Sequence, residues 1–318
     1  MASTPPNARL APTPGYGGGQ NRKSGEGGGS SERPLAAIGL LLIAMTIVPF
    51  MDAAAKALSE RYDLVQIVWA RYFFHFFLIA PLVLLRFGAS GLKPPRLAAQ
   101  VVRGGLLLGS TAFFFAAIAR LPLADALALV FVAPLIVTAL SPWLLGEVVG
   151  PRRFSAVAVG FVGVLIIVRP GFGVFDLGAL LALAGGTTFA FYLLATRRLS
   201  GSSPALVTLA FTALLGAVAM TILLPWFWIT PSFTDLLLMA SMGLIAAVGH
   251  LCVIKAYDWG EASLLAPFGY SEIITMTLVG YIFFGDFPDA WTWTGIAVVT
   301  ASGVYISLRE RRRSQAKH

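Results

Sequence analysis

A succession of long apolar runs constrains the fold of this chain more than any other feature. After Pro34, ten runs follow one another, each near the roughly 20 residues that cross a bilayer as a helix. Lipid offers no hydrogen-bond partner to the backbone, so each run is expected to be an α-helix. We therefore predict an all-α membrane protein with transmembrane helices at 35–57, 64–86, 98–119, 123–145, 152–169, 176–197, 204–228, 233–257, 262–285 and 289–308.

The scarcity of charge supports this class. Only 12% of the 318 residues are charged, whereas soluble domains carry about a quarter. The net charge of +8 would suit nucleic acid, but the basic residues are scattered between the apolar runs. We expect a lipid bilayer around the protein and no nucleic-acid partner. The single cysteine, Cys252, excludes a disulfide framework and a multi-cysteine metal site, and we expect neither a metal nor a cofactor.

Both ends of the chain differ from its middle. Residues 1–34 are rich in Gly, Pro and Ser and are expected to form a disordered tail, and residues 309–318 form a basic tail. The run 35–57 could be a cleaved signal peptide, because three alanines after Asp52 resemble a cleavage site. Its length and the charges of Asp52 and Lys56 favour a retained helix.

The distribution of Lys and Arg predicts the orientation. Basic residues gather at every second connection, on the side that also holds both tails, while the opposite connections hold only Arg61, Arg120 and Arg169. Because positive residues are retained in the cytoplasm, we predict cytoplasmic termini in a bacterial-type inner membrane.

The two halves of the chain resemble each other, which predicts repeats at 35–171 and 172–308. The matches are Thr46 with Thr187 and Lys56 with Arg197 at an offset of 141, and Gly146-Glu147 with Gly285-Asp286 at an offset of 139. Five runs per half is an odd number, so the second half must enter the membrane inverted. Inverted repeats are typical of secondary transporters, in which the halves exchange shapes. Chance matching of apolar residues is the alternative.

Certain motifs carry a family resemblance. The stretch W-L-L-G-E ends the fourth run, and A-S-L-L-A-P-F-G-Y-S-E with G-Y-I-F-F-G-D covers the ninth. With two five-run halves, the chain resembles the EamA-type branch of the drug/metabolite transporter superfamily, over residues 35–308. The resemblance implies ten helices around a central cavity and alternating-access transport of small metabolites without enzymatic activity.

The resemblance is nearest to exporters of amino acids, including aromatic ones, and amino acid export is the leading expectation. Uptake or efflux of another amphipathic metabolite, such as a nucleoside-type cofactor, a vitamin or an amine, is the alternative. A receptor or assembly protein without transport is a further one. An intramembrane enzyme is disfavoured, because the motifs HExxH, GxSxG and GxGD are absent from the sequence. The expected partner is a small-molecule substrate; one chain is expected to suffice, and a dimer is left open.

Glu272 is the strongest candidate for a site residue. It lies about ten residues into an apolar run, where a carboxylate must face the protein interior or a watery cavity. It could bind a substrate ammonium or exchange a proton, with His250 at comparable depth. The alternative is a protonated carboxyl that bonds a backbone carbonyl freed by Pro267.

A second candidate group lies in the run 64–86. Arg71 and His75 are four residues apart and share a helix face. Arg71 is predicted to bind a substrate carboxylate, and His75 to line the cavity. A structural ion pair of Arg71 with Asp52, with Lys56 one turn further along, is the alternative, and the two interpretations are compatible.

Aromatic and proline residues complete the predicted site. Trp69, Tyr72 and Tyr270 are candidates to line a cavity for amphipathic solutes, and packing is the alternative for each. Prolines inside apolar runs free backbone carbonyls and act as kinks or hinges; these are Pro49, Pro81, Pro134 and Pro267.

Overall fold

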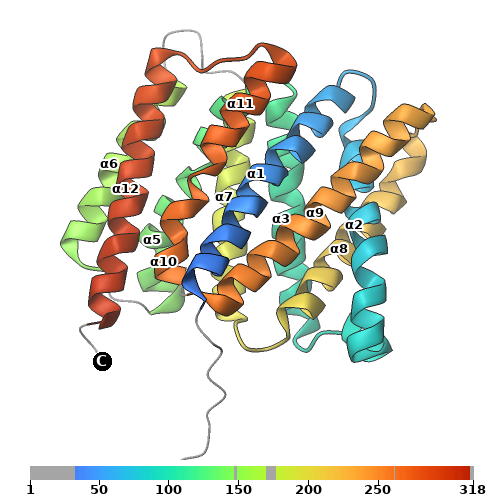
Figure 1. Cartoon of the computed structure of the whole chain (residues 1–318), viewed down its shortest axis with the longest axis horizontal. Helices are drawn as coiled ribbons and strands as arrows, with labels where there is room; N and C mark the ends of the chain where they lie inside the picture. The colour runs from blue at the N-terminus through green and yellow to red at the C-terminus, as the bar shows by residue number, and fades with distance from the viewer. Residues whose placement is uncertain (1–32, 147–148, 170–176, 261, 316–318) are drawn as a thin grey trace, which may run out of the picture.

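The computed structural model describes residues 33–146, 149–169, 177–260 and 262–315 (Figure 1). Within these residues the regular structure is helical, without a strand. The α-helices are α1 (Pro34–Leu58), α2 (Leu64–Phe87), α3 (Leu97–Ile118), α4 (Leu123–Val130), α5 (Val132–Leu145), α6 (Pro151–Val168), α7 (Leu177–Arg198), α8 (Ala205–Leu223), α9 (Phe233–Trp259), α10 (Ala262–Gly269), α11 (Glu272–Phe284) and α12 (Ala290–Gln315). Two 3₁₀ segments, η1 (Ala89–Leu92) and η2 (Leu224–Trp226), follow α2 and α8.

Most of the predicted transmembrane helices are supported by the length and hydropathy of the observed helices. Eight segments of the described chain are long and apolar enough to cross a bilayer, namely α1, α2, α3, α4 with α5, α6, α7, α8 with η2, and α9. The broken pair α10–α11 and the Trp- and Thr-containing helix α12 occupy the two remaining predicted runs. The chain is a multi-pass membrane protein.

Local sequence explains where the helices begin and end. The Asp63 carboxylate accepts from the Val65 amide at the start of α2, and the Ser232 hydroxyl accepts from the Asp235 amide at the start of α9. Such caps satisfy amides that have no partner within the helix. After α11, Gly285 takes a φ of 71°, a left-handed conformation that glycine adopts without strain.

Two of the predicted helices are broken in the middle. Phe131 separates α4 from α5, and Tyr270 and Ser271 separate α10 from α11. Pro134 is the third residue of α5, and Pro267 lies inside α10, so both are close to these breaks. The other two predicted kink sites behave differently, because α1 continues through Pro49 and α2 through Pro81.

The major helix contacts obey the symmetry of an inverted repeat. The repeat makes α1 equivalent to α7, α3 to α9 and α6 to α12. The two most extensive contacts are α1 with α9 and α3 with α7, which the symmetry interchanges. The next, α6 with α12, joins two equivalent helices, as does α2 with α8. Each of these contacts joins one half to the other, so the halves interleave and are not two separate bundles.

This arrangement gives a bundle with two distinct ends. In Figure 1 α6 and α12 lie at the left, α2 and α8 at the right, and α1 crosses in front of α3 and α7. The start of α1 and the end of α12 lie at the same end of the bundle. We call it the proximal end, and the opposite one, which holds the connection between α11 and α12, the distal end.

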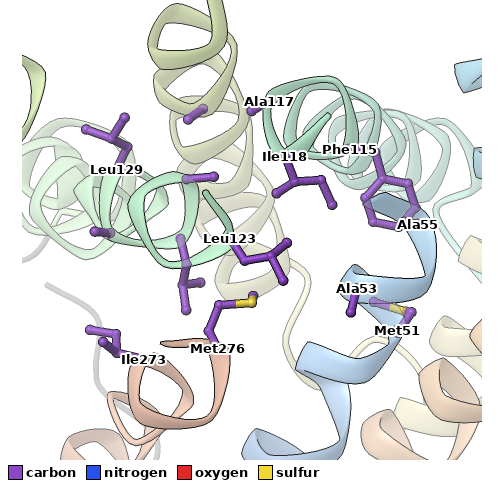
Figure 2. Packing of buried hydrophobic residues seen from close by; sticks show 14 of the residues in the cluster. Met51, Ala53, Ala55, Phe115, Ala117, Ile118, Leu123, Leu129, Ile273 and Met276 are labelled. Atoms are coloured by element: carbon purple, nitrogen blue, oxygen red, sulfur yellow. The ribbon is translucent and has the colours of Figure 1, made fainter. Parts of the chain in front are cut away.

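Apolar side chains fill the bundle toward the distal end. Ala55, Phe115, Ile118, Leu123 and Met276, at most 3% exposed, come from α1, α3, α4 and α11. Figure 2 shows Met276 pointing at Leu123, and Phe115 lying against the turn of α1 that carries Ala55. These five residues, called the distal apolar layer below, pack together in the interior at this end of the bundle.

Candidate functional site

Five ionisable side chains from four helices gather in the interior of the bundle. They are Asp52 of α1, Arg71 and His75 of α2, His250 of α9, and Glu272 of α11. Glu272 lies within electrostatic range of Asp52. Asp52 lies within range of Arg71, and Arg71 lies within range of both histidines. We call this set the central cluster; all five were predicted from the sequence as site or ion-pair residues.

A close helix crossing brings the two histidines together. A Cβ on Gly243 of α9 would lie 2.3 Å from the Phe74 Cβ and 2.6 Å from the His75 amide nitrogen of α2. Only glycine permits this approach. The imidazole rings of His75 and His250 stack with centroids 5.3 Å apart and an interplanar angle of 20°.

The histidines differ in their hydrogen bonds. The His250 Nδ1 donates to the Ala246 carbonyl at 2.7 Å, which leaves its Nε2 as an acceptor. His75 is 4% exposed, and its Nε2 has no hydrogen-bond partner among the described residues. A buried polar nitrogen without a partner is costly, so His75 has spare capacity for a ligand.

Arg71 is oriented by α3. Its Nη1 donates to the Thr111 hydroxyl at 2.5 Å, and that hydroxyl also lies 3.0 Å from the Tyr72 hydroxyl. The guanidinium lies 5.4 Å from the Tyr72 ring centroid and 5.5 Å from that of Phe115. Its Nε is buried and has no partner within the described chain. The cation is held in place without being neutralised, so it can receive an anion.

The predicted structural ion pair is not formed. In the described part of the chain, neither Arg71 nor Lys56 makes an ion pair with Asp52. Lys56 lies one turn closer to the distal end, where its Nζ contacts the Asp286 Oδ2 at 3.0 Å and donates to the Leu121 carbonyl at 2.7 Å. Asp52 is 3% exposed and accepts no hydrogen bond from the described residues.

Glu272 begins α11 directly after the helix break. Its side chain is half-buried and has no hydrogen bond within the described structure. Two residues earlier, the ring centroid of Tyr270 lies 4.9 Å from that of Phe131 at the other break. Phe131 and Tyr270 are equivalent at the offset of 139, so the two breaks meet. A Cβ on Gly303 would lie only 1.7 Å from the Tyr270 hydroxyl oxygen. Only glycine at position 303 allows this approach.

Tyr72 lies against the Arg71 guanidinium of the central cluster, whereas the contacts of Trp69 are with α2, α8 and Trp228. The Trp69 Nε1 donates to the Thr221 hydroxyl of α8 at 3.0 Å, and its ring stacks on Phe73 with centroids 4.7 Å apart. It also meets Trp228 edge-on at 5.8 Å. These contacts join α2 to α8 and give Trp69 a packing role.

Sequence reasoning missed a buried arginine of α3. Arg103 of α3 was counted among the basic residues that flank a membrane run, yet it is 3% exposed. Its Nη2 donates to the Thr208 carbonyl at 3.1 Å and to the Thr212 hydroxyl at 2.5 Å, and its guanidinium lies over the Tyr192 ring. It joins α3 to α7 and α8. Its position seven residues into α3, not before it, is the signal that could have revealed it.

Comparison with known proteins decides the family. The model of the EamA-like transporter family matches this chain twice, over residues 35–169 and 176–308. The chain belongs to the EamA-like transporter family. As a family member it is a transporter of small metabolites and not an enzyme. The two matches lie within the segments predicted as repeats, 35–171 and 172–308.

Bacterial relatives in this family carry different solutes. The chain is 24% identical to an S-adenosylmethionine uptake transporter of Rickettsia prowazekii, over 87% of this chain and 94% of that protein. It is 30% identical to a riboflavin transporter of Rhizobium johnstonii, over 63% of this chain and 67% of the relative. It is 25% identical to a pseudopaline exporter of Pseudomonas aeruginosa, over 86% and 97%. Amino acid export, the leading expectation from the sequence, is not among these activities.

A solved structure shares the fold of this EamA-family chain. It is titled "Crystal structure of protein", has a TM-score of 0.63 and 20% sequence identity, and the match covers 88% of this chain and 99% of that one. At this identity the likeness concerns the fold alone.

Proposed function

We propose that this EamA-family transporter carries small metabolites with an α-amino-acid group across a bacterial inner membrane by alternating access. Amino acid export is the first case of this proposal, with both termini in the cytoplasm. The observation that carries it is the polarity of the central cluster: an arginine and two imidazoles on one side, two carboxyls on the other, and no ion pair between them among the described residues.

The cost of buried charge supports this proposal. Ionisable groups inside a membrane protein are expensive, and are kept where they pair with one another or act on a solute. Arg71 and Asp52 lie within electrostatic range without pairing directly. A solute that carries both a carboxylate and an ammonium would satisfy both sides at once. Its carboxylate would bind Arg71 near His75, and its ammonium would bind Glu272 and Asp52.

The aromatic pair at the helix breaks suits the remainder of such a solute. Tyr270 lies two residues from Glu272 and contacts Phe131. An apolar or aromatic group attached to the α-carbon would meet these rings while the charged groups occupy the cluster. S-adenosylmethionine, named for one relative, combines an α-amino-acid group with an aromatic base and fits the same description.

Uptake into proteoliposomes tests the proposal. The panel holds tryptophan, leucine, S-adenosylmethionine and riboflavin, with tryptamine and indole-3-propionate as analogues that each lack one charged group. We expect saturable, protein-dependent flux of at least one solute with an α-amino-acid group and little flux of the two analogues. Transport of tryptamine, indole-3-propionate or riboflavin, with none of the solutes that carry both groups, would contradict it.

A further inference from the structure

At the distal end, Lys56 ties the two halves together. Its Nζ contacts the Asp286 Oδ2 at 3.0 Å, and Asp286 follows α11 in the second half. The same ammonium donates to the Leu121 carbonyl at 2.7 Å, in the connection between α3 and α4 of the first half. It also lies 5.2 Å from the ring centroid of Phe284, the last residue of α11. One side chain thus holds three segments that surround the distal apolar layer.

A second ion pair joins the halves at the same end. The Arg169 Nη2 lies 2.5 Å from both carboxylate oxygens of Asp289. Asp289 also accepts from the Thr292 amide at 2.8 Å and so caps the start of α12. The bond to Arg169 lowers the pKa of Asp289 to about 2. This pair therefore connects the distal end of α6 to the distal end of α12.

The second ion pair joins two helices that the symmetry of the repeat relates to each other. α6 and α12 are equivalent helices and pack directly on each other. Ser302 of α12 donates to the Ala156 carbonyl of α6, and a Cβ on Gly163 of α6 would lie 3.1 Å from the Gly295 carbonyl of α12. At the offset of 139, Ala156 corresponds to Gly295 and Gly163 to Ser302. Each contact is thus the symmetry image of the other.

Contacts of this kind are kept when the halves exchange shapes. Suppose that each half adopts the present conformation of the other. The contact of Ala156 with Ser302 then takes the geometry of the contact of Gly295 with Gly163, which already exists. The Lys56–Asp286 contact lies instead at the distal end, where it joins α1 of the first half to the segment after α11 of the second. A transporter that opens its ends in turn must therefore break the Lys56 contacts to open the distal end, while the α6–α12 pair stays packed.

We propose that Lys56, bound to Asp286 and Leu121, is the latch of a distal gate over the apolar layer, and that Arg169–Asp289 is a permanent tie of the α6–α12 pair. The proposal rests on the alternating access proposed above. The place of each pair in the fold, and not its strength, distinguishes the latch from the tie, because both ion pairs are partly exposed. Ion pairs that water reaches are weak enough to break and re-form in each cycle.

Cysteine accessibility tests the gate without any solute. Met276→Cys, placed in a Cys252→Ala background, reports opening of the distal apolar layer to a water-soluble maleimide in lipid nanodiscs. We expect Lys56→Gln and Asp286→Asn each to accelerate labelling by about threefold or more, the factor expected for loss of a partly exposed ion pair. Arg169→Gln, which breaks the other ion pair at the same end but leaves the Asp289 cap, should label at the parent rate. No acceleration in either latch variant, or equal acceleration in Arg169→Gln, would overturn the assignment.

Cross-linking gives a second test. In the Cys252→Ala background, a short bifunctional thiol reagent across Lys56→Cys and Asp286→Cys should stop transport, and reversal of the cross-link should restore it. A disulfide between Ala156→Cys and Ser302→Cys should leave transport within about twofold of the reduced protein, because that contact is kept. The proposal is contradicted if the cross-link between positions 56 and 286 leaves transport unchanged. It is also contradicted if the disulfide between positions 156 and 302 stops transport. If none of the panel solutes is transported, the substrate proposal fails, and the labelling experiment still decides the gate.

Discussion

At the scale of single residues, two arginines within transmembrane helices show how similar signals can have different outcomes. Arg103 is surrounded by oxygen acceptors from three helices and joins them. Arg71 has one hydroxyl acceptor, Thr111, and a buried Nε without a partner among the described residues. An unmet buried donor costs about 1–3 kcal/mol, a cost that a bound carboxylate would remove. Arg103 thus has the contacts of a structural residue, and the unmet donor of Arg71 supports its proposed role in binding.

The acidity of Asp289 makes a prediction about pH. Its pKa is about 2 in the folded protein, against 3.8 for the free group, because Arg169 binds the carboxylate. A lowered folded-state pKa gives stability that is present above the unfolded value and lost as the pH falls through the folded one. We expect Arg169→Gln to lower the thermal midpoint by the same amount from about pH 7 to pH 5, and by less below about pH 4.

The measurement is thermal unfolding of both proteins in detergent across this range. The loss should be below about 1 kcal/mol at neutral pH, because the pair is partly exposed. A difference that grows as the pH falls would contradict the assigned ion pair.

The limits of sequence reasoning at this scale are physical. Glu272, Arg71, His75 and His250 could be chosen because an ionisable residue in an apolar run is unusual wherever it lies. The partners of such residues could not be predicted from the sequence, because ion pairs join positions that are far apart in the chain. Lys56 contacts Asp286, which is 230 residues away. The sequence suggested Asp52 as its partner, because Asp52 is one helical turn away. Glu147, which the repeat aligns with Asp286, lies outside the described residues.

At the scale of helices, the predicted spans agree with the structure because length and hydropathy decide them locally. The breaks at Phe131 and Tyr270 were suggested by Pro134 and Pro267, yet Pro49 and Pro81 sit in continuous helices. A proline in the interior of a helix removes one backbone hydrogen bond. Whether the helix then separates depends on packing, such as the meeting of the two breaks through their aromatic rings.

The crossing of α2 and α9 at Gly243 leads to a prediction about packing. Gly243→Ala places a methyl group 2.3 Å from the Phe74 Cβ and against the backbone of His75, so the helices must move apart. We expect the free energy of unfolding to fall by about 1–3 kcal/mol, as is typical of overpacking. Denaturant titration in detergent measures it. The control is Gly105→Ala on α3, where nothing lies within 4 Å.

Gly105→Ala should be neutral or stabilising, because alanine favours the helix by about 0.5–1 kcal/mol over glycine. Equal losses in both variants would show that helix propensity, and not the close approach, governs position 243. A loss confined to Gly243→Ala would support the crossing that stacks His75 on His250.

At the scale of the whole molecule, the interleaving of the halves has a mechanical consequence. Equivalent helices pair at both sides of the bundle, α6 with α12 and α2 with α8, while the unlike pairs α1–α9 and α3–α7 interchange under the symmetry. The central cluster takes residues from α1, α2, α9 and α11, so both halves contribute to it. Any exchange of shape between the halves therefore changes the surroundings of Asp52, Arg71 and Glu272 together. The internal repeat in the sequence predicted the symmetry, but matched residues alone could not predict which helices pair.

The central claim is that one solute site, containing Glu272, is exposed to the two sides of the membrane in turn. Counterflow into proteoliposomes tests it most directly: vesicles loaded with excess unlabelled solute are diluted into a trace of the same labelled solute. We predict transient accumulation of label by the parent protein and by Glu60→Gln, at an exposed turn residue, and at least about tenfold less by Glu272→Gln, a loss typical of a removed charged contact. The claim would be contradicted if Glu272→Gln accumulated label as strongly as the parent protein. It would also be contradicted if unlabelled solute inside the vesicles did not stimulate uptake of label by the parent protein.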